Sequence, residues 1–237
     1  RGLLALGLSL PATARNAIAA HVRLLLAWNE AINLTAITDP EAIATRHVVD
    51  SLTAASLLVG ARRVLDLGSG GGFPGLPLAA ALPHAHLTLV DSVAKKARFL
   101  EAAAAATGLA RRVTVVAARA ETVAASRPPG EPGWDVVTAR GVASLAELLE
   151  LALPLLRPGG RLIAWKRGEL AAELEAAGRA AAALGASDPT VRPASPPAAS
   201  GRAIPGLEGH VLVEIRRIGT TPPGYPRDAA ARRRHPW

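Results

Sequence analysis

The sequence predicts an α/β fold in which helices cover both faces of a mostly parallel sheet. From residue 62 onward, short apolar runs of strand length alternate with longer helical segments, a pattern typical of parallel strands joined by helices. The first run ends in a glycine-rich stretch that leads into a helix, which indicates close approach of a ligand to the backbone. We expect an N-terminal helical extension at 1–60, a core at 61–218 and a basic C-terminal tail at 219–237.

The extension is predicted to contain two long helices. Apolar residues recur at helical spacing over 11–28. A second helix is expected to begin after Asp39, because Asp is a favourable N-cap and Pro40 suits the first helical position. His47 and Asp50 lie three residues apart on that helix and so share a face. We expect them to form a packed, hydrogen-bonded pair between the extension and the sheet rather than a catalytic dyad.

The core is predicted to consist of alternating strands and helices, with one irregular stretch before its last strand and a tail after it. The stretch 187–206 is rich in Pro, Ser and Gly and is expected to be a loop or a weak strand. The stretch 219–237, with two adjacent prolines and a run of arginines, is expected to be an extended tail. The remaining core segments are predicted strands at 64–67, 87–90, 113–117, 136–139, 161–165 and 211–218, and predicted helices at 75–82, 93–107, 145–156 and 169–184.

Composition narrows the function classes. The net charge is +8 and the pI is about 11.2, which favours a polyanionic partner. Residues 216–237 hold six arginines against one acid, Asp228. Cysteine is absent, which excludes disulfides, zinc–thiolate sites and cysteine nucleophiles, and we assign no metal ligands. No apolar run approaches a membrane span and no signal peptide is visible, so we expect a cytoplasmic monomer. The chain begins at Arg1 and contains no Met, so we expect that its native start was lost or was assigned too late.

The glycine-rich loop follows Asp66 with the spacing G-x-G-x-G, counted from Gly68 through Gly70. A dinucleotide fingerprint would require glycine where Phe73 stands, so the dehydrogenase interpretation weakens. The loop is instead similar to the first motif of S-adenosylmethionine-dependent methyltransferases. The alternative is a glycine-rich structural turn without a ligand.

Polar residues at the ends of the next strands agree with a nucleoside site. Asp91 ends the second strand, where a carboxylate can accept hydrogen bonds from ribose hydroxyls; the alternative is an N-cap for the following helix. Ala120 and Glu121 follow the third strand, where the backbone could read the adenine edge; the alternative is a solvated Glu. Arg140 ends the fourth strand and could bind a cofactor carboxylate or a substrate phosphate, with a surface salt bridge as its alternative.

Two common methyltransferase chemistries lack their residues here. The segment 138–144 does not carry the Asn/Asp-Pro-Pro-aromatic motif of enzymes that methylate exocyclic amines. Cytosine carbon-5 methylation needs a cysteine nucleophile, which this chain does not have.

Sequence blocks from Trp28 to the end of the chain match one family in combination. They are Trp28-Asn29, 33–35, Arg46-His47, 50–52, 66–78, Asp91-Ser92, Lys95-Lys96, Phe99-Leu100, Arg140, 143–145, 165–168, 225–227 and His235-Pro236. Together these blocks resemble the bacterial ribosomal RNA small subunit methyltransferase G family, also called glucose-inhibited division protein B, which methylates guanine N7 in 16S ribosomal RNA. One departure is that 228–231 lacks the Gly-x-Pro usual after Tyr-Pro-Arg.

The resemblance implies a class I methyltransferase (Rossmann-like) fold, S-adenosyl-L-methionine as cofactor, and 16S ribosomal RNA of the small subunit as partner. It places cofactor contacts at Gly68, Phe73, Ala120, Glu121 and Arg140. To these the strand ends and the loop spacing add Asp91 and Gly70.

Guanine N7 carries a free lone pair, so transfer of a methyl group to it requires alignment and electrostatics more than a general base. We therefore assign no catalytic residue.

Trp165 could stack on a base, although packing in the core is the more frequent fate of such a Trp. Alternatives in other classes are a non-catalytic cofactor-binding regulator and a small-molecule methyltransferase. The residues expected to contact RNA phosphates are Lys166, Arg167, Arg140, Arg232, Arg233 and Arg234.

Overall fold

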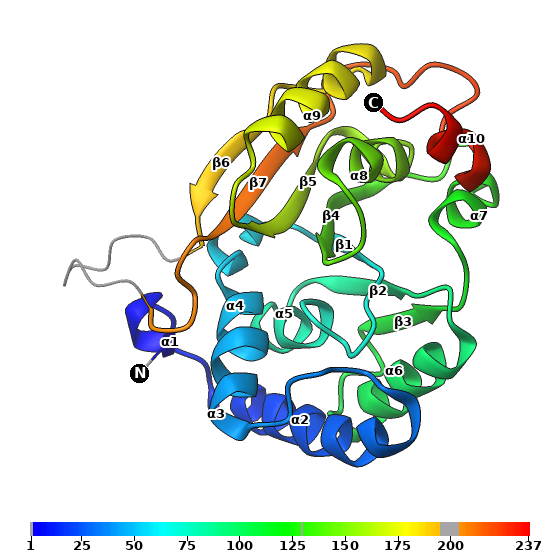
Figure 1. Cartoon of the computed structure of the whole chain (residues 1–237). Helices are drawn as coiled ribbons and strands as arrows, with labels where there is room; N and C mark the ends of the chain where they lie inside the picture. The colour runs from blue at the N-terminus through cyan, green and yellow to red at the C-terminus, as the bar shows by residue number, and fades with distance from the viewer. Residues whose placement is uncertain (1, 129, 195–203) are drawn as a thin grey trace.

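One sheet of seven strands, in the order β3-β2-β1-β4-β5-β7-β6, runs through the part of the chain that the structure describes. That structure is a computed structural model, and it describes residues 2–128, 130–194 and 204–237 (Figure 1). Neighbouring strands are parallel from β3 to β5, while β7 pairs antiparallel with both β5 and β6. The predicted α/β fold with a mostly parallel sheet is confirmed. The strands are β1 (Arg63–Leu67), β2 (His86–Val90), β3 (Val113–Val116), β4 (Trp134–Arg140), β5 (Leu156–Arg167), β6 (Thr190–Pro193) and β7 (His210–Arg216).

The strand order reverses at β1, which pairs with β2 on one side and β4 on the other. In an open sheet of this kind, ligands bind beyond the carboxyl ends of the strands on either side of that point. Chain segments that follow β1, β2, β3 and β4 meet there, so the sequence-predicted site residues of the core lie at one edge of the sheet.

Helices cover both faces of the sheet (Figure 1). Val64 of β1 packs into the core with Phe99, whereas Leu65, the next residue, packs into a second core with Leu149. This alternation buries both faces of the strand and explains its continuous apolar run. The helices are α1 (Gly2–Ala5), α2 (Ala12–Ile32), α3 (Pro40–Ile43), the π-helix η1 (Ala44–Val49), α4 (Asp50–Leu52), the 3₁₀-helix η2 (Ala55–Leu58), α5 (Gly75–Ala81), α6 (Ala94–Ala106), α7 (Ala120–Ala125), α8 (Leu145–Ala152), α9 (Ala171–Leu184) and α10 (Ala229–Arg234).

The N-terminal extension is helical, as predicted. Its first long helix, α2, packs against α5 and α6. The Asp39 carboxylate accepts a hydrogen bond from the Ala42 amide at 2.8 Å, which confirms the predicted N-cap. The helix beyond it is not a regular α-helix, because Ala44–Val49 forms a π-helical turn before α4 begins. Such turns are frequent at functional sites, and this one carries His47.

The C-terminal segment is folded, so the prediction of an extended tail was wrong. The Asp228 carboxylate accepts a hydrogen bond from the Ala231 amide at 2.7 Å and caps α10. Arg227 forms a two-pronged ion pair with the fully buried Glu150, with its Nη2 at 2.7 Å from Oε2 and its Nε at 3.0 Å from Oε1. Burial by itself raises the pKa of Glu150, but hydrogen bonds from Arg227 outweigh it and hold that pKa below its ordinary value. The tail is therefore anchored on α8.

Two further elements bear on the sequence-based expectation. A short strand, β6, lies in 187–206, which confirms the weak strand among the two alternatives there; residues 195–203 are outside the described part of the chain. Helix α7 was not expected at all.

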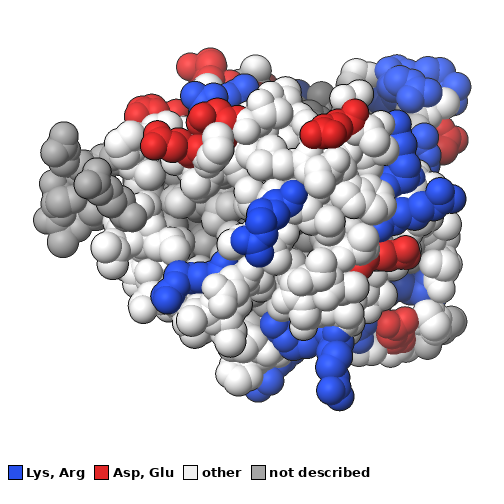
Figure 2. All heavy atoms as spheres, turned by 90° about the horizontal axis from the view of Figure 1, so that it is seen from below, with Lys and Arg blue, Asp and Glu red and all other residues white. Residues whose placement is uncertain are grey.

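On the face seen in Figure 2, several basic side chains gather along the right-hand margin and acidic ones at the upper left, while those in the centre stand apart with uncharged surface between them. Within the described residues, no helix has the length and apolar character that a membrane span requires.

Candidate active site

The glycine-rich loop is held at both ends by Asp66, the last polar residue of β1. Its buried carboxylate accepts hydrogen bonds from the Thr138 hydroxyl of β4 at 2.8 Å and from the Gly75 amide at 3.1 Å. A Cβ added at Gly75 would lie 2.4 Å from a methyl carbon of Leu89, so α5 can begin this close to the sheet only with glycine there. Burial raises the pKa of Asp66 from 3.8 to about 6.

Gly68 makes the turn out of β1. Its φ of 71° lies in the left-handed region that favours glycine, and a Cβ there would lie 2.6 Å from a methyl carbon of Val142. The Gly68 and Ser69 amides both donate to the Val90 carbonyl, at 2.8 and 3.0 Å. The turn therefore ties the end of β1 to the end of β2 and leaves space beside the backbone.

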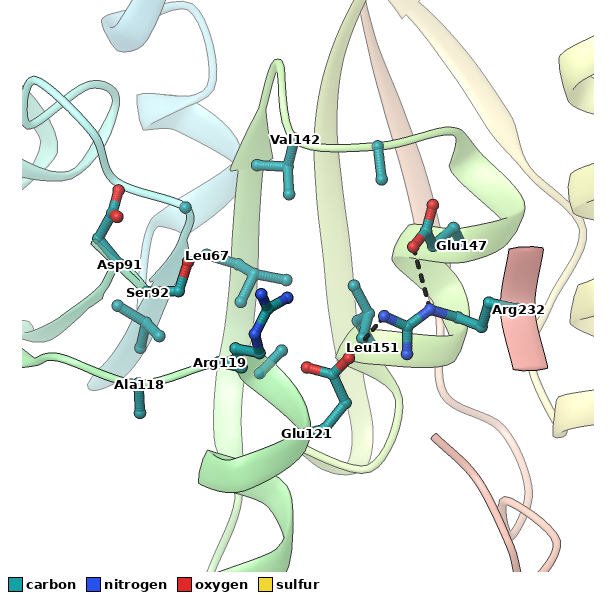
Figure 3. Close-up of a pocket in the computed structure, with 14 residues that line it drawn as sticks. Leu67, Asp91, Ser92, Ala118, Arg119, Glu121, Val142, Glu147, Leu151 and Arg232 are labelled. Carbon is teal, nitrogen blue, oxygen red and sulfur yellow. Dashed lines mark hydrogen bonds and ion pairs between the residues drawn. The ribbon is translucent and has the colours of Figure 1, made fainter. Parts of the chain in front are cut away.

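A first cavity of about 200 Å³ opens beside this turn (Figure 3). Asp91 lies on one side of it, and Glu121 lies across from Asp91. The Asp91 carboxylate accepts hydrogen bonds from the Gly70 amide at 2.9 Å and from the Val93 amide at 2.8 Å, so it orders both the glycine loop and the start of α6. The predicted residues that line this cavity are Gly68, Asp91, Ala120 and Glu121.

Arg232 closes the wall of the first cavity beyond Glu121 (Figure 3). Its guanidinium donates to Glu121 Oε1 at 2.5 Å and to Glu147 Oε1 at 3.0 Å, and only 9% of the residue is exposed. The sequence grouped Arg232 with Arg233 and Arg234 as one run of phosphate contacts. The structure separates these three residues. Arg232 turns inward to two carboxylates, whereas Arg233 and Arg234 are exposed to solvent.

Arg140 lies at the end of β4 and joins the sheet to the N-terminal extension. Its Nη1 donates to Asp50 Oδ2 at 2.9 Å and to the Arg46 carbonyl at 3.0 Å, and its Nη2 lies 3.2 Å from His47 Nδ1. His210 Nδ1 lies 3.1 Å from the other oxygen of Asp50. The expected direct pair of His47 and Asp50 is replaced by an indirect one, because the guanidinium of Arg140 bridges them. The salt bridge of Arg140 is internal rather than superficial.

His47 is neutral at physiological pH and has a defined tautomer. Burial, and next the positive charge of Arg140, lower the pKa of His47 to about 4. Because a guanidinium can only donate, Nδ1 of His47 is the acceptor, and Nε2 carries the proton donated to the Thr35 hydroxyl at 2.7 Å. Both ring nitrogens are thus engaged, and His47 has no free lone pair with which to accept a proton.

Phe73 lies between the imidazole rings of His47 and His21. The His47 ring stacks on it at 4.7 Å and the His21 ring lies at 4.6 Å, while the Arg140 guanidinium is 5.5 Å from its centre. His21, from α2, has its Nε2 at 2.8 Å from the carbonyl of Gly71. Burial lowers the pKa of His21 to about 4. The extension thus presses on the glycine loop from its outer side.

A second cavity, of about 480 Å³, opens on the other side of Arg140, at the ends of β4 and β5. Lys166 lines it, with its Nζ at 2.5 Å from Glu173 Oε1 and 2.8 Å from the Ala143 carbonyl. Trp165 is 5% exposed and donates to the Asp50 carbonyl at 2.8 Å, so it packs in the core, and it also lines this cavity. The charged or titratable residues of this cavity are Arg46, His47, Asp50, Arg140, Lys166, Arg167, Glu173 and His210.

Gly70 and Phe73 line neither cavity, although both are in the loop whose first residue, Gly68, lines the first cavity. Sequence reasoning missed Glu147, Glu173 and His210. None of these follows a strand in the pattern that indicated Asp91. Glu147 and His210 pair with residues 85 and 160 positions away. Glu173 pairs with Lys166, seven residues before it, and also accepts from the Leu145 amide, 28 residues away.

Comparison with known proteins identifies the family. A sequence model of the GidB family, rRNA small subunit methyltransferase G, matches residues 14–197. The ribosomal RNA small subunit methyltransferase G of Roseiflexus castenholzii is 48% identical over 204 residues, which cover 86% of this chain and 83% of the relative. That of Desulfitobacterium hafniense is 40% identical over 86% of this chain and 82% of the relative.

A solved structure supports the fold alone. An O-methyltransferase from Bacillus cereus in complex with SAH superposes with a TM-score of 0.59 at 20% identity, covering 84% of this chain and 90% of that one. The family is shown by the sequence relatives, and the resemblance seen in the flanking blocks is confirmed. The chain belongs to the ribosomal RNA small subunit methyltransferase G family.

Proposed function

We propose that the protein transfers the methyl group of S-adenosylmethionine to N7 of a guanine in 16S ribosomal RNA of the small ribosomal subunit. The methyltransferase class follows from family membership. The observation that carries the proposal is the pair of cavities at one edge of the sheet, the first with nucleoside-binding groups and the second bordered by cations. The choice of N7 is supported by the family.

The first cavity fits the adenosine part of this cofactor. Each oxygen of Asp91 accepts one backbone N–H and keeps a lone pair for a ribose hydroxyl. Gly68 presents bare backbone at the cavity, and Ala120 and Glu121 lie where a base edge would be read. When bound, S-adenosylmethionine supplies a methyl group on a positively charged sulfur, which makes that group transferable without further activation.

The second cavity fits a nucleotide of a polyanion. Arg46 and Arg167 are exposed at it, and neither guanidinium has an ion-pair partner among the described residues. Arg140 and Lys166 add positive charge deeper in the cavity, next to their carboxylate partners. Such an arrangement binds phosphates through Coulomb attraction and bidentate hydrogen bonds. The target guanine must come from a loop or be displaced from its stack to enter.

The chemistry needs positioning rather than proton transfer. As the N7–CH₃ bond forms, the S–CH₃ bond breaks and its electron pair stays on sulfur, so no proton is removed before attack. The structure agrees with this requirement, because His47 is neutral and both of its nitrogens are already hydrogen-bonded. Arg140, His47 and Asp50 are therefore proposed to hold the base and the loop in line for attack.

The decisive experiment is methyl transfer from radiolabelled S-adenosylmethionine to small subunits isolated from a strain that lacks the orthologous enzyme. We expect labelling of the 16S RNA at one guanine, located by primer extension after cleavage at the modified base. Naked 16S RNA assayed in parallel shows whether the assembled subunit is required. Cofactor binding without any transfer would contradict the enzyme and favour a regulator.

A further inference from the structure

Arg232 is held from three sides at the edge of the first cavity. Nε donates to Glu147 and Nη2 donates to Glu121 (Figure 3). Nη1 donates to the carbonyl of Arg227. Because a guanidinium is planar and its donors have a fixed direction, these contacts fix the plane of the group and the orientation of the carboxylates it binds.

The position of Arg232 is set by the tail rather than by the cavity. Arg227 is paired with the buried Glu150, the Trp237 indole donates to the same carboxylate at 3.0 Å, and Asp228 caps the helix. These anchors would place Arg232 at the cavity wall with or without a ligand there. The C-terminal segment thus forms part of the cavity wall, held in place by its own contacts with α8.

Glu121 shows what this placement achieves. Its Oε1 is bound by Arg232, whereas Oε2 has no hydrogen bond with any residue that the structure describes. Glu121 lies in the first turn of α7 and lines the cavity across from Asp91. An ionised carboxylate only accepts hydrogen bonds. It therefore complements the 6-amino group of adenine and opposes the 6-oxo group of hypoxanthine, which is an acceptor.

We propose that Arg232 is a positioning residue of the cofactor site, which holds Glu121 so that its free oxygen accepts from the adenine 6-amino group. The C-terminal helix thereby makes the site selective for a 6-aminopurine nucleoside. This inference rests on the proposed function, because it assumes that the first cavity takes the adenosine of S-adenosylmethionine.

The test compares two ligands by titration calorimetry, S-adenosylhomocysteine and S-inosylhomocysteine, which differ in the amino and oxo groups at position 6. The wild-type protein is expected to prefer the first by roughly 10- to 100-fold, because the mismatched pair leaves two acceptors facing each other. In Arg232→Ala the preference falls to about 3-fold or less. Arg179→Ala removes an exposed arginine of α9, away from both cavities, and keeps the wild-type preference.

Two companion variants separate positioning from a general structural effect. Glu121→Gln lowers the preference as Arg232→Ala does, and the double variant shows no further loss, because both changes remove one interaction. The melting temperature without ligand confirms that each variant is folded. If Arg232→Ala does not fold, Arg232→Lys decides, since it keeps a cation but loses the planar fork; its preference falls if the inference is right and stays at the wild-type value if it is wrong.

The outcomes also separate this inference from the proposed function. Wild-type protein that binds neither ligand contradicts the cofactor assignment itself. Wild-type selectivity that survives in folded Arg232→Ala overturns the positioning role. Tighter binding of S-adenosylhomocysteine by Arg232→Ala overturns it too, because that result means that Arg232 obstructs the cavity.

Discussion

The two cavities share one edge of the sheet but differ in the balance of their polar groups. Around the first, Asp91, Glu121 and Glu147 offer carboxylate oxygens, Arg232 is tied to two of these acids, and Arg119 adds one exposed guanidinium. Around the second, exposed Arg46 and Arg167 offer donors. A nucleoside presents hydroxyl and amino hydrogens, whereas a nucleic acid presents phosphate oxygens, so each cavity complements one of the two. The difference indicates that the two cavities are distinguished by their hydrogen-bonding groups as well as by their shape.

The largest effect is expected from Arg140→Ala, which removes the guanidinium that joins Asp50 to His47 at the edge of the second cavity. Asp50, His47 and the face of Phe73 all lose their guanidinium contact, so we expect methyl transfer to fall about 100-fold or more through misalignment. Activity assays that separate kcat from KM for the RNA, with the affinity for S-adenosylhomocysteine, show which ligand Arg140 serves. Arg140→Lys keeps the charge and should recover part of the loss. Activity within a few-fold of wild type in a folded Ala variant would refute the bridging role.

Asp91→Ala should act on the first cavity only. We expect the affinity for S-adenosylhomocysteine to fall by roughly 10- to 100-fold, because two acceptors for ribose and the tie to the Gly70 amide disappear together. Calorimetry measures this directly, with Asp188→Ala as the control, since Asp188 is an exposed acid whose side chain makes no contact in the described structure. An unchanged affinity would disprove the ribose role.

Arg46→Ala combined with Arg167→Ala should act on the second cavity only. Binding to small-subunit RNA is expected to weaken, with the slope of log affinity against log salt reduced by about 1 for each charge that contacts a phosphate. The affinity for S-adenosylhomocysteine should stay the same. Arg179→Ala, which removes an exposed arginine of α9 paired with Glu175, is the matched control. An unchanged salt slope in the double variant would argue that RNA binds elsewhere, and Arg233 and Arg234 would be neutralised next.

The smallest effect concerns pH. His21 and His47 have pKa values of about 4 in the folded protein against 6.5 in the unfolded chain, so unfolding takes up protons between these values and stability decreases as pH falls from 6.5 to 4. Asp66 acts in the opposite direction, since its pKa is raised to about 6 and the folded state binds that proton first. Asp66→Asn should therefore increase the decrease in unfolding free energy between pH 6.5 and pH 4 by on the order of 1–2 kcal/mol.

Urea unfolding at a series of pH values measures this slope. A profile equally steep in Asp66→Asn and wild type would contradict the opposing contribution of Asp66.

Features set by short-range chemistry could be predicted from the sequence. The cap at Asp39, the turn at Gly68 and the carboxylate at the end of β2 each depend on a few neighbouring residues. The strands of the core could be predicted because both of their faces are buried and their apolar runs are continuous. Those features already place the first cavity.

Features set by distant pairing could not be predicted. His210 meets Asp50 across 160 residues, and Arg232 meets Glu121 across 111. No local pattern distinguishes Arg232 from Arg233, yet one points into the cavity wall and the other to solvent. The folded tail could not be predicted either. Its arginines have the pattern of a solvated run, and only the structure shows that Glu150 and Glu147 face them.

The π-helical turn at Ala44–Val49 has a consequence for insertions and deletions. Such a turn holds one residue more than a regular α-helical turn. Removing a single residue there would restore a regular α-helical turn, so the residues within the turn would change their angular spacing about the helix axis. His47 and Asp50 could then no longer both meet Arg140. The length of this segment is therefore as strictly constrained as the identity of its residues.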